Sequence, residues 1–260
     1  MYDDYIGYDM GWRLKLVKAL DIHANDTILD IATGTADIPI LIANQSTELS
    51  SHIHDPSDSI LGPIIGLDPS MEMLNIGQRK IQKLHYQHAI QLVHGDVQNM
   101  SHFESDYFSK ISMSFGLRNV ENRTRGLVEI FRIFKSSVPT GHSLSKFCIL
   151  EFSRPSSGYL SQLAILFIQY ALPTIGTLLT GNYKAYKHLS DSILEFPLPN
   201  QLIDELHGIG FVNCEFENVF QDIVYLYTCS GEFDKINTEN ESKNDDYEFI
   251  AQTELNLNGL

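Results

Sequence analysis

The chain has 260 residues, 43% of them hydrophobic, which is typical of a globular protein with a sizeable buried core. Its formal net charge of −15 argues against a nucleic-acid partner, because the phosphate backbone requires a basic face. No apolar run reaches the roughly 20 residues that a membrane-spanning helix needs. Residues 232–260 hold eight acids and two lysines, a charge of −6, and are predicted to be a disordered tail after one domain over 1–231.

Apolar and small residues recur in runs that predict strands and helices in turn through the first 150 residues. The expected elements are, in chain order, helix 11–20, strand 27–32, helix 37–44, strand 63–67, helix 71–84, strands 89–93 and 108–115, helix 123–137 and strand 143–152. This alternation predicts an α/β fold, in which helices cover both faces of a parallel sheet. The remaining elements are helices 159–172, 183–194 and 201–206, then strands 212–219 and 223–229, which are close enough to form a hairpin.

The cysteines give no sign of a cross-link or a metal site. Cys148, Cys214 and Cys229 show neither metal-ligand nor disulfide spacing, and each lies in an apolar, strand-like context. We therefore expect inert buried thiols in a reducing compartment. His52 and His54 are close in sequence but have no further ligands nearby, so no metal is expected there either.

The segment Thr27–Asp37, TILDIATGTAD, is the candidate ligand-binding turn. A buried strand runs into small residues, and a helix then begins, so backbone can approach a ligand closely and unpaired N–H groups face it. In open α/β sheets, ligands bind beyond the carboxyl ends of the strands. The predicted strand ends bring the following polar residues to that edge: Asp30, Asp68, Asp96, Arg118 and Glu151.

Asp68 has the position of a ribose ligand. Such an acid normally follows the turn by about 20 residues. Gly34 and Asp68 are 34 residues apart, but residues 46–62 contain five serines, Pro56 and Gly62, and are typical of an inserted loop. Without these 17 residues the spacing is 17, which indicates a cofactor that contains a nucleoside.

The turn also restricts the kind of nucleoside cofactor. It lacks the glycines of a dinucleotide site, and the chain has no phosphate-binding loop of the G-x-x-x-x-G-K-[ST] type. Asp30 would repel phosphate and attract a cation. S-adenosyl-L-methionine has a ribose, an adenine, an amino group and a sulfonium, but no phosphate. It is the favoured cofactor; a structural turn with acids placed by chance is the alternative.

Several segments resemble the UbiE-type C-methyltransferases of ubiquinone and menaquinone biosynthesis. The two signatures are SFGLRNV at 114–120 and LEFSRP at 150–155. Similar segments are LPTIG at 172–176, YKHLSDSI at 186–193 and Phe196-Pro197, and the resemblance covers about 5–230. It implies the class I S-adenosylmethionine-dependent methyltransferase fold, a Rossmann-like α/β fold with a seven-stranded sheet and a C-terminal antiparallel hairpin.

The resemblance implies C-methylation of a polyprenylated benzoquinol in ubiquinone biosynthesis, with demethylmenaquinol as the alternative acceptor. Its candidate catalytic residues are Arg118, which would stabilise a developing oxyanion or orient a base, and Asp37, which would accept the proton or act only as a first-turn helix acid. The implied cofactor contacts are Asp30 and Gly34 at the methionine end, Asp68 at the ribose and Asp96 at the adenine amino group, with Thr33 and Ser114 lining the same site.

Two differences from the family keep a non-catalytic alternative open. Thr33 and Ala36 stand where the family has glycine, and the family's segment before its match to Gly7–Trp12 lies mostly outside this chain. The alternative is a scaffold within a quinone-biosynthesis complex. A methyltransferase of the same fold for a sterol or a phenol is a third reading, against which the two signatures argue.

The resemblance also sets expectations for partners and location. The partner is a polyprenylated quinol, and a homodimer or a quinone-biosynthesis complex is compatible with it. The apolar helix 159–172 would pack on the domain, cover the isoprenoid chain or rest on a membrane surface as a peripheral contact. In a eukaryote the location would be the matrix side of the mitochondrial inner membrane, with the targeting segment absent from this sequence, and otherwise the cytoplasm.

Overall fold

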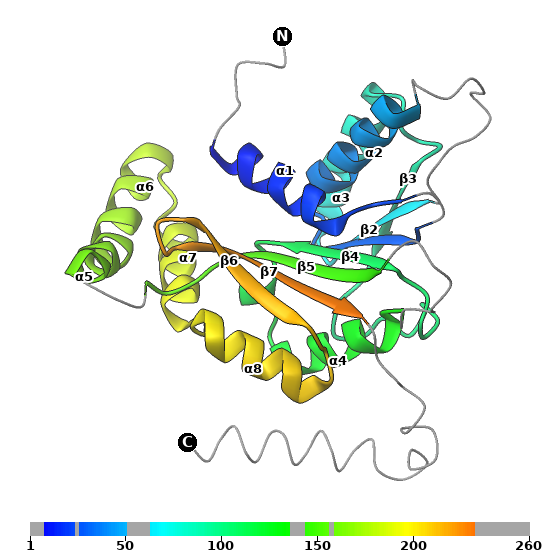
Figure 1. Cartoon of the computed structure of the whole chain (residues 1–260). Coiled ribbons are helices and arrows are strands. Elements are labelled where there is room, and N and C mark those ends of the chain that lie inside the picture. Colours follow the sequence, from blue (N-terminus) through cyan, green and yellow to red (C-terminus); the bar gives the residue numbers. More distant parts are fainter. Residues whose placement is uncertain (1–7, 24–25, 51–62, 136–143, 156–158, 232–260) are drawn as a thin grey trace.

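In the computed structural model, the described residues are 8–23, 26–50, 63–135, 144–155 and 159–231 (Figure 1). The acidic tail and most of the predicted inserted loop lie outside these ranges. Among the described residues, no helix is long and apolar enough to cross a membrane.

A seven-stranded sheet forms the centre of the fold, with strand order β3-β2-β1-β4-β5-β7-β6. The first five strands along the chain are parallel, and β7 runs antiparallel between β5 and β6, so the predicted sheet and its C-terminal hairpin are confirmed. The strand bounds are β1 Ile28–Ile31, β2 Ile64–Asp68, β3 Ile90–His94, β4 Lys110–Ser114, β5 Ser145–Phe152, β6 Cys214–Phe220 and β7 Val224–Gly231.

Helices cover both faces of this sheet, as expected for an alternating chain. Figure 1 shows α1 (Tyr8–Leu20), α2 (Asp37–Ser50) and α3 (Met71–Lys83) on one face, and their side chains share one apolar cluster with Ile28 and Leu150. The other face carries α4 and α8, which pack with Phe147. The bounds of the remaining helices are α4 Arg123–Ile133, α5 Tyr159–Leu166, α6 Leu172–Thr180, α7 Tyr183–Glu195 and α8 Pro199–Ile209.

Several helix boundaries differ from the sequence prediction, and the largest differences are at the end of α2 and after α5. Helix α2 continues to Ser50, so residues 46–50 are helical and only 51–62 of the predicted loop lie outside the described residues. The helix predicted over 159–172 does not end there, because a π-helical segment, Phe167–Ala171, leads directly into α6. Pro173 lies at the start of α6, directly after the π-helical segment.

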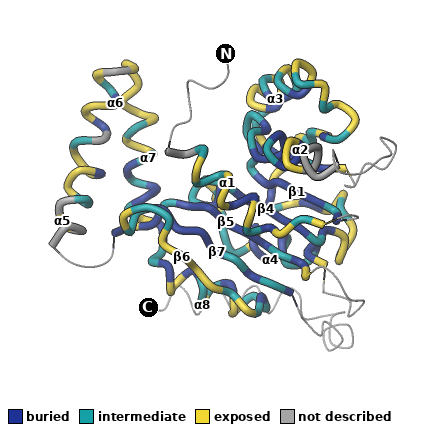
Figure 2. The backbone as a smooth tube through the Cα atoms, turned by 45° about the horizontal axis from the view of Figure 1, so that its top comes forward, coloured by how far each residue is buried: buried dark blue, intermediate teal, exposed yellow. Residues whose placement is uncertain are grey.

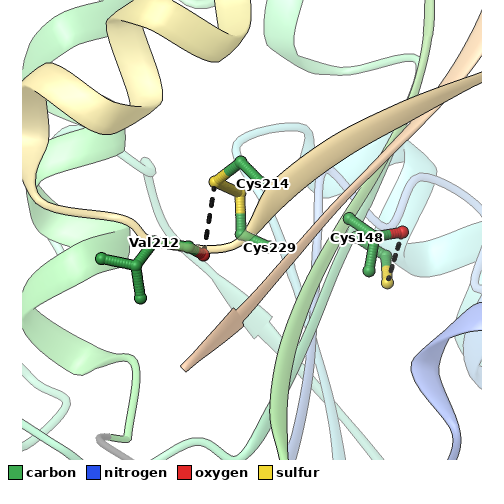
Figure 3. The surroundings of a disulfide bond; sticks show 5 residues. Cys148, Val212, Cys214 and Cys229 are labelled. Atoms are coloured by element: carbon green, nitrogen blue, oxygen red, sulfur yellow. Dashed lines mark hydrogen bonds between the residues drawn. A yellow bond between two sulfur atoms is a disulfide. The ribbon is translucent and has the colours of Figure 1, made fainter. Parts of the chain in front are cut away.

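The expectation of three free thiols is wrong. Cys214 and Cys229 form a disulfide between β6 and β7 (Figure 3), and Cys148 is the free cysteine. The two partners are 15 residues apart and face each other only because the hairpin register places them opposite, so local spacing gives no signal. Cys148 matches its expectation, because it is buried and burial raises the pKa of its thiol to about 12.

Reduction of this disulfide is expected to lower the free energy of unfolding by up to about 3 kcal/mol, the loop-closure value for a 15-residue separation. Urea unfolding with and without dithiothreitol measures the change. The double variant Cys214→Ser/Cys229→Ser is the control and should not respond to the reductant. In urea, a thiol reagent should label one cysteine before reduction and three afterwards. Labelling of all three before reduction would show that the disulfide is absent.

Candidate active site

Asp30 is a buried carboxylate near the carboxyl end of β1. It is only 1% exposed, and the hydroxyl of Ser112 on the neighbouring strand β4 donates to its Oδ1 at 2.7 Å. Burial raises the pKa of Asp30 to about 7, although the Ser112 hydrogen bond opposes the shift. A nearby cation would stabilise the ionised form, so this position is suited to a positively charged ligand group.

The turn after β1 has an unusual backbone. Ala32, Gly34 and Ala36 all have positive φ values, 55°, 55° and 64°. The amide of Gly34 donates to Asp68 Oδ2 at 2.8 Å, which fixes the turn against the end of β2. A Cβ atom added at Gly34 would meet nothing within 4 Å. The backbone at Gly34 is therefore open to a ligand.

The two side chains that replace family glycines point into the protein. Thr33 is 7% exposed and Ala36 is fully buried. Each lies against a glycine of a neighbouring element: a Cβ added at Gly66 on β2 would lie 2.8 Å from Thr33 Oγ1, and one added at Gly77 on α3 would lie 3.2 Å from Ala36 Cβ. The extra atoms therefore fill space inside the protein and do not cover the turn.

Replacing Thr33 by glycine is expected to lower the free energy of unfolding by about 1–2 kcal/mol, because a packed side chain is lost and the unfolded chain gains freedom. Affinity for the expected cofactor should change by less than about threefold. Urea unfolding and titration calorimetry measure the two effects. Gly66→Ala is the matched test of packing. Made in the native protein, it should lower the free energy of unfolding more than the same substitution made in the Thr33→Gly variant. A large gain in cofactor affinity in Thr33→Gly would contradict the geometry.

The other expected cofactor residues lie at neighbouring strand ends. Asp68, 7% exposed, accepts the amides of Gly34 and Ser70, which leaves its carboxylate with lone pairs for hydroxyl donors. Asp96 lies after β3 and accepts the amide of Gln98 at 2.8 Å. Ser114 Oγ, at the end of β4, is buried and has no hydrogen-bond partner among the described residues. Such an acidic set, with an open turn, fits S-adenosyl-L-methionine better than a phosphate-bearing cofactor.

The end of β4 lies directly beside this turn. A Cβ added at Gly116 would lie 2.4 Å from Ala32 Cβ, so only glycine allows this approach. The segment continues as a short 3-10 helix, η2 (Leu117–Asn119), which contains the predicted catalytic residue Arg118. The turn and the SFGLRNV signature, far apart in sequence, therefore border the same edge of the sheet.

Arg118 is held by a partner that the sequence analysis named only as a strand end. Its Nη1 lies 2.6 Å from Glu151 Oε1 and donates to the carbonyl oxygen of Phe115 at 2.7 Å. Glu151, on β5, is fully buried; burial raises its pKa, against the effect of Arg118. Arg118 Nε is buried without a hydrogen-bond partner among the described residues. Both side-chain bonds of Arg118 use Nη1, so other guanidinium N–H groups remain available for a ligand.

Asp37 has a different environment from Arg118. Its carboxylate pairs with Arg13 on α1 and with Lys80 on α3, each at 2.6 Å. Burial opposes its ionisation, but Lys80 and Arg13 outweigh this effect and hold its pKa below the ordinary value. A carboxylate with a lowered pKa is a weaker base, so the geometry favours the structural role at the start of α2. Nothing in the sequence pattern indicated these two cations.

The sheet order, the open turn and the acidic strand ends define a class I S-adenosylmethionine-dependent methyltransferase. The fold is similar to that in a crystal structure from Methanococcus maripaludis described as an S-adenosyl-L-methionine-dependent methyltransferase, with a TM-score of 0.55 and 18% identity over 88% of this chain and 89% of that chain. The chain belongs to the ubiE/COQ5 methyltransferase family, whose model matches residues 5–230.

Two curated relatives show the breadth of the family. The ubiquinone/menaquinone biosynthesis C-methyltransferase UbiE of Geotalea daltonii is 33% identical over 85% of this chain and 86% of its own length. The demethylmenaquinone methyltransferase of Bacteroides fragilis is 30% identical over 86% of this chain and 83% of its own. Both relatives are bacterial, and they give the expected mitochondrial location no support.

Proposed function

We propose that this methyltransferase transfers the methyl group of S-adenosyl-L-methionine to a ring carbon of a polyprenylated quinol. The observation that carries the proposal is the Arg118–Glu151 pair at the end of β4, beside the cofactor turn. The family membership supports the same reaction. The expected acceptor is a benzoquinol, and the naphthoquinol demethylmenaquinol is its competitor, because the named relatives include enzymes of both descriptions.

The acidic strand ends would hold the cofactor. Asp30 and the open backbone at Gly34 suit its methionine end, and Asp68 suits the ribose hydroxyls. Asp96 and Ser114 complete the proposed site with contacts to the adenine and the methionine side. When bound, S-adenosyl-L-methionine supplies an electrophilic methyl group on a sulfonium. The protein must orient the two reactants, exclude water and stabilise the developing charge.

Arg118 is proposed to act on the quinol oxygen. A ring carbon attacks more readily when the neighbouring hydroxyl becomes phenolate-like, so negative charge develops on that oxygen. Glu151 and the Phe115 carbonyl hold the guanidinium in one orientation through its Nη1, which leaves other N–H groups of the guanidinium for the quinol oxygen. A fixed donor of this kind stabilises developing charge without reorganisation.

The polyprenyl chain of the acceptor needs an apolar surface, and the α5–α6 face offers one. Residues 159–180 contain no Asp, Glu, Lys or Arg. Figure 2 shows α5 and α6 standing beside the main body with much exposed surface. The large apolar side chains exposed on this face are Leu166, Phe167, Tyr170, Ile175 and Leu178. We place the isoprenoid chain, or a peripheral contact with the membrane that carries it, on this face.

Leu178→Glu tests the α5–α6 face. Leu178 is 81% exposed, so the change should leave the fold intact while placing a charge on the apolar surface. It is expected to raise KM about tenfold for a long-chain quinol, and much less for an analogue without the chain. Leu14→Glu on α1, at 51% exposure, is the matched control and should affect neither substrate. Equal effects on both substrates would contradict this placement.

The experiment that tests the proposed function supplies both acceptors. Purified protein receives S-adenosyl-L-methionine with 2-methoxy-6-polyprenyl-1,4-benzoquinol or with demethylmenaquinol, each reduced beforehand, and mass spectrometry detects the added CH2 unit. A higher kcat/KM for one quinol identifies the ring. Cofactor binding in calorimetry without any methylated product would favour the scaffold alternative, and so would the absence of binding. A homodimer or a larger complex stays a prediction.

A further inference from the structure

A histidine lies against the short η2 helix that contains the proposed catalytic arginine. His188, on α7, is exposed, and its Nε2 lies 3.3 Å from Asn119 Oδ1. Asn119 directly follows Arg118 in η2, and α7 packs against η2. The two residues come from elements 69 positions apart in sequence, so the sequence pattern alone does not join them.

The hydrogen bonds around Asn119 define which nitrogen of His188 carries the proton. The side-chain amide of Asn119 faces the Phe115 carbonyl oxygen at 3.5 Å. A carbonyl oxygen only accepts, so the amide nitrogen faces Phe115 and Oδ1 faces His188. Oδ1 in turn only accepts, so neutral His188 carries its proton on Nε2. Its Nδ1 is then the basic nitrogen.

We propose that His188 accepts the proton of the quinol hydroxyl at Nδ1, and that Asn119 is the positioning residue that sets its tautomer. This inference rests on the proposed function. Arg118 and Asn119 both hydrogen-bond to the Phe115 carbonyl, so one short segment holds both the oxyanion donor and the partner of the base. The protonated ring keeps its bond to Asn119, because Nε2 remains a donor.

The step balances without a further reactant. The O–H bond of the quinol breaks, its proton forms an N–H bond at Nδ1, and the electron pair stays on oxygen. The ring carbon then forms the new C–C bond to the methyl group, while the S–C bond breaks with its pair on sulfur. Water then takes the proton of that ring carbon, and the C–H electron pair restores the aromatic ring. The imidazolium returns its proton to the quinolate oxygen, so one proton is released to solvent overall.

Few charged groups surround His188. Arg118 is the charged residue of the packed η2, and residues 167–180, which form the neighbouring π-helical segment and α6, contain no Asp, Glu, Lys, Arg or His. Tyr170 is the tyrosine of that stretch. On its own helix the charged neighbours are Lys184, Lys187 and Asp191, of which the last two form an ion pair.

His188→Gln is the decisive variant, because glutamine can still donate to Asn119 but cannot accept a proton. With saturating cofactor, kcat should fall about 10²-fold, and the acid limb of its pH profile should disappear. S-adenosylhomocysteine affinity should stay unchanged. In His188→Ala, added imidazole should restore part of kcat. His88→Gln, an exposed histidine before β3, is the matched control and should keep full activity.

A measurement independent of turnover tests the role of Asn119. Nitrogen-15 NMR of the imidazole should show neutral His188 protonated at Nε2, and Asn119→Leu should remove this preference. Unchanged kcat in His188→Gln overturns the inference, and so does a loss that imidazole does not restore and that leaves the pH profile intact. If the native protein methylates neither quinol, the proposed function is wrong, and the role of His188 is wrong with it. If the native protein is active, the His188 variants test the role of His188 alone.

Discussion

Replacing Arg118 by alanine is expected to reduce methyl transfer by about 10²–10³-fold and to lower the free energy of unfolding by about 3–5 kcal/mol. The first effect removes the proposed donor to the quinol oxygen. The second follows from Glu151, which is fully buried and would lose its ion-pair partner at 2.6 Å. Affinity for S-adenosyl-L-methionine should stay near the native value, because the proposed cofactor acids Asp30, Asp68 and Asp96 lie on other strand ends. Calorimetry, kinetics and urea unfolding measure the three quantities.

A neutral replacement of the pair separates catalysis from folding. Arg118→Met with Glu151→Gln keeps similar volumes and removes both charges, so most of the lost stability should return. Methyl transfer should not return with it. If activity recovers together with stability, Arg118 acts through the fold alone. An equal loss of cofactor affinity in Arg118→Ala would instead place Arg118 in the cofactor site.

The sequence predicts most of this fold because the alternating part of the chain is regular. Each strand from β1 to β5 is a short apolar run, and each intervening helix has its own apolar stripe, so existence and order of the elements follow from periodicity. The end of α2 and the continuation into α6 do not follow. The serines after Asn44 are typical of a loop, yet α2 continues to Ser50. The π-helical segment Phe167–Ala171 has no distinct sequence pattern.

Some features of the candidate site can be predicted from the sequence, and others cannot. Acids at strand ends can be predicted, because neighbouring parallel strands end at one edge of the sheet. The pairing of Arg118 with Glu151 could also have been inferred. Arg118 follows β4, Glu151 lies near the end of β5, and these two strands are neighbours in the sheet. The cations on Asp37 could not, because they come from two helices that pack over the turn. The disulfide also escapes prediction, because it depends on a hairpin register that contains an irregularity near Asn218.

The departures at Thr33 and Ala36 show how a motif can vary while its geometry is retained. Compared with the family by residue type alone, Thr33 and Ala36 each replace a glycine. In the fold, the added atoms lie against Gly66 and Gly77, which have no side chains of their own. Ala36 keeps the positive φ of the turn at 64° without glycine, and Gly34 is the position where the backbone faces open space. These two side chains therefore do not crowd the cofactor turn, and they give little support to a non-catalytic scaffold.

Replacing Asp30 by asparagine is expected to make the protein more stable and to impair cofactor binding. In the folded protein burial raises the pKa of Asp30 from 3.8 to about 7, so between these values the folded state holds a proton that the unfolded state releases. Native stability must therefore fall as pH rises from about 4 to 7. Asparagine does not titrate, so its advantage should grow to about 4 kcal/mol by pH 8.

The cofactor effect has the opposite sign. Ionised Asp30 is the proposed partner of the cationic methionine end, so Asp30→Asn should weaken S-adenosyl-L-methionine binding by roughly 10²-fold at pH 8. The native affinity should itself fall below pH 7, as Asp30 becomes protonated, and the variant should lack this dependence. Urea unfolding and calorimetry at pH 5 and pH 8 measure both effects.

Asp26→Asn is the matched control: Asp26 is also buried but lies before β1 and pairs with Lys110, so its loss should destabilise the fold and leave cofactor affinity unchanged. A native stability that does not fall between pH 5 and 8 relative to Asp30→Asn would show that Asp30 is not strained by burial, and would remove the physical reason for placing the cofactor's positive charge beside it.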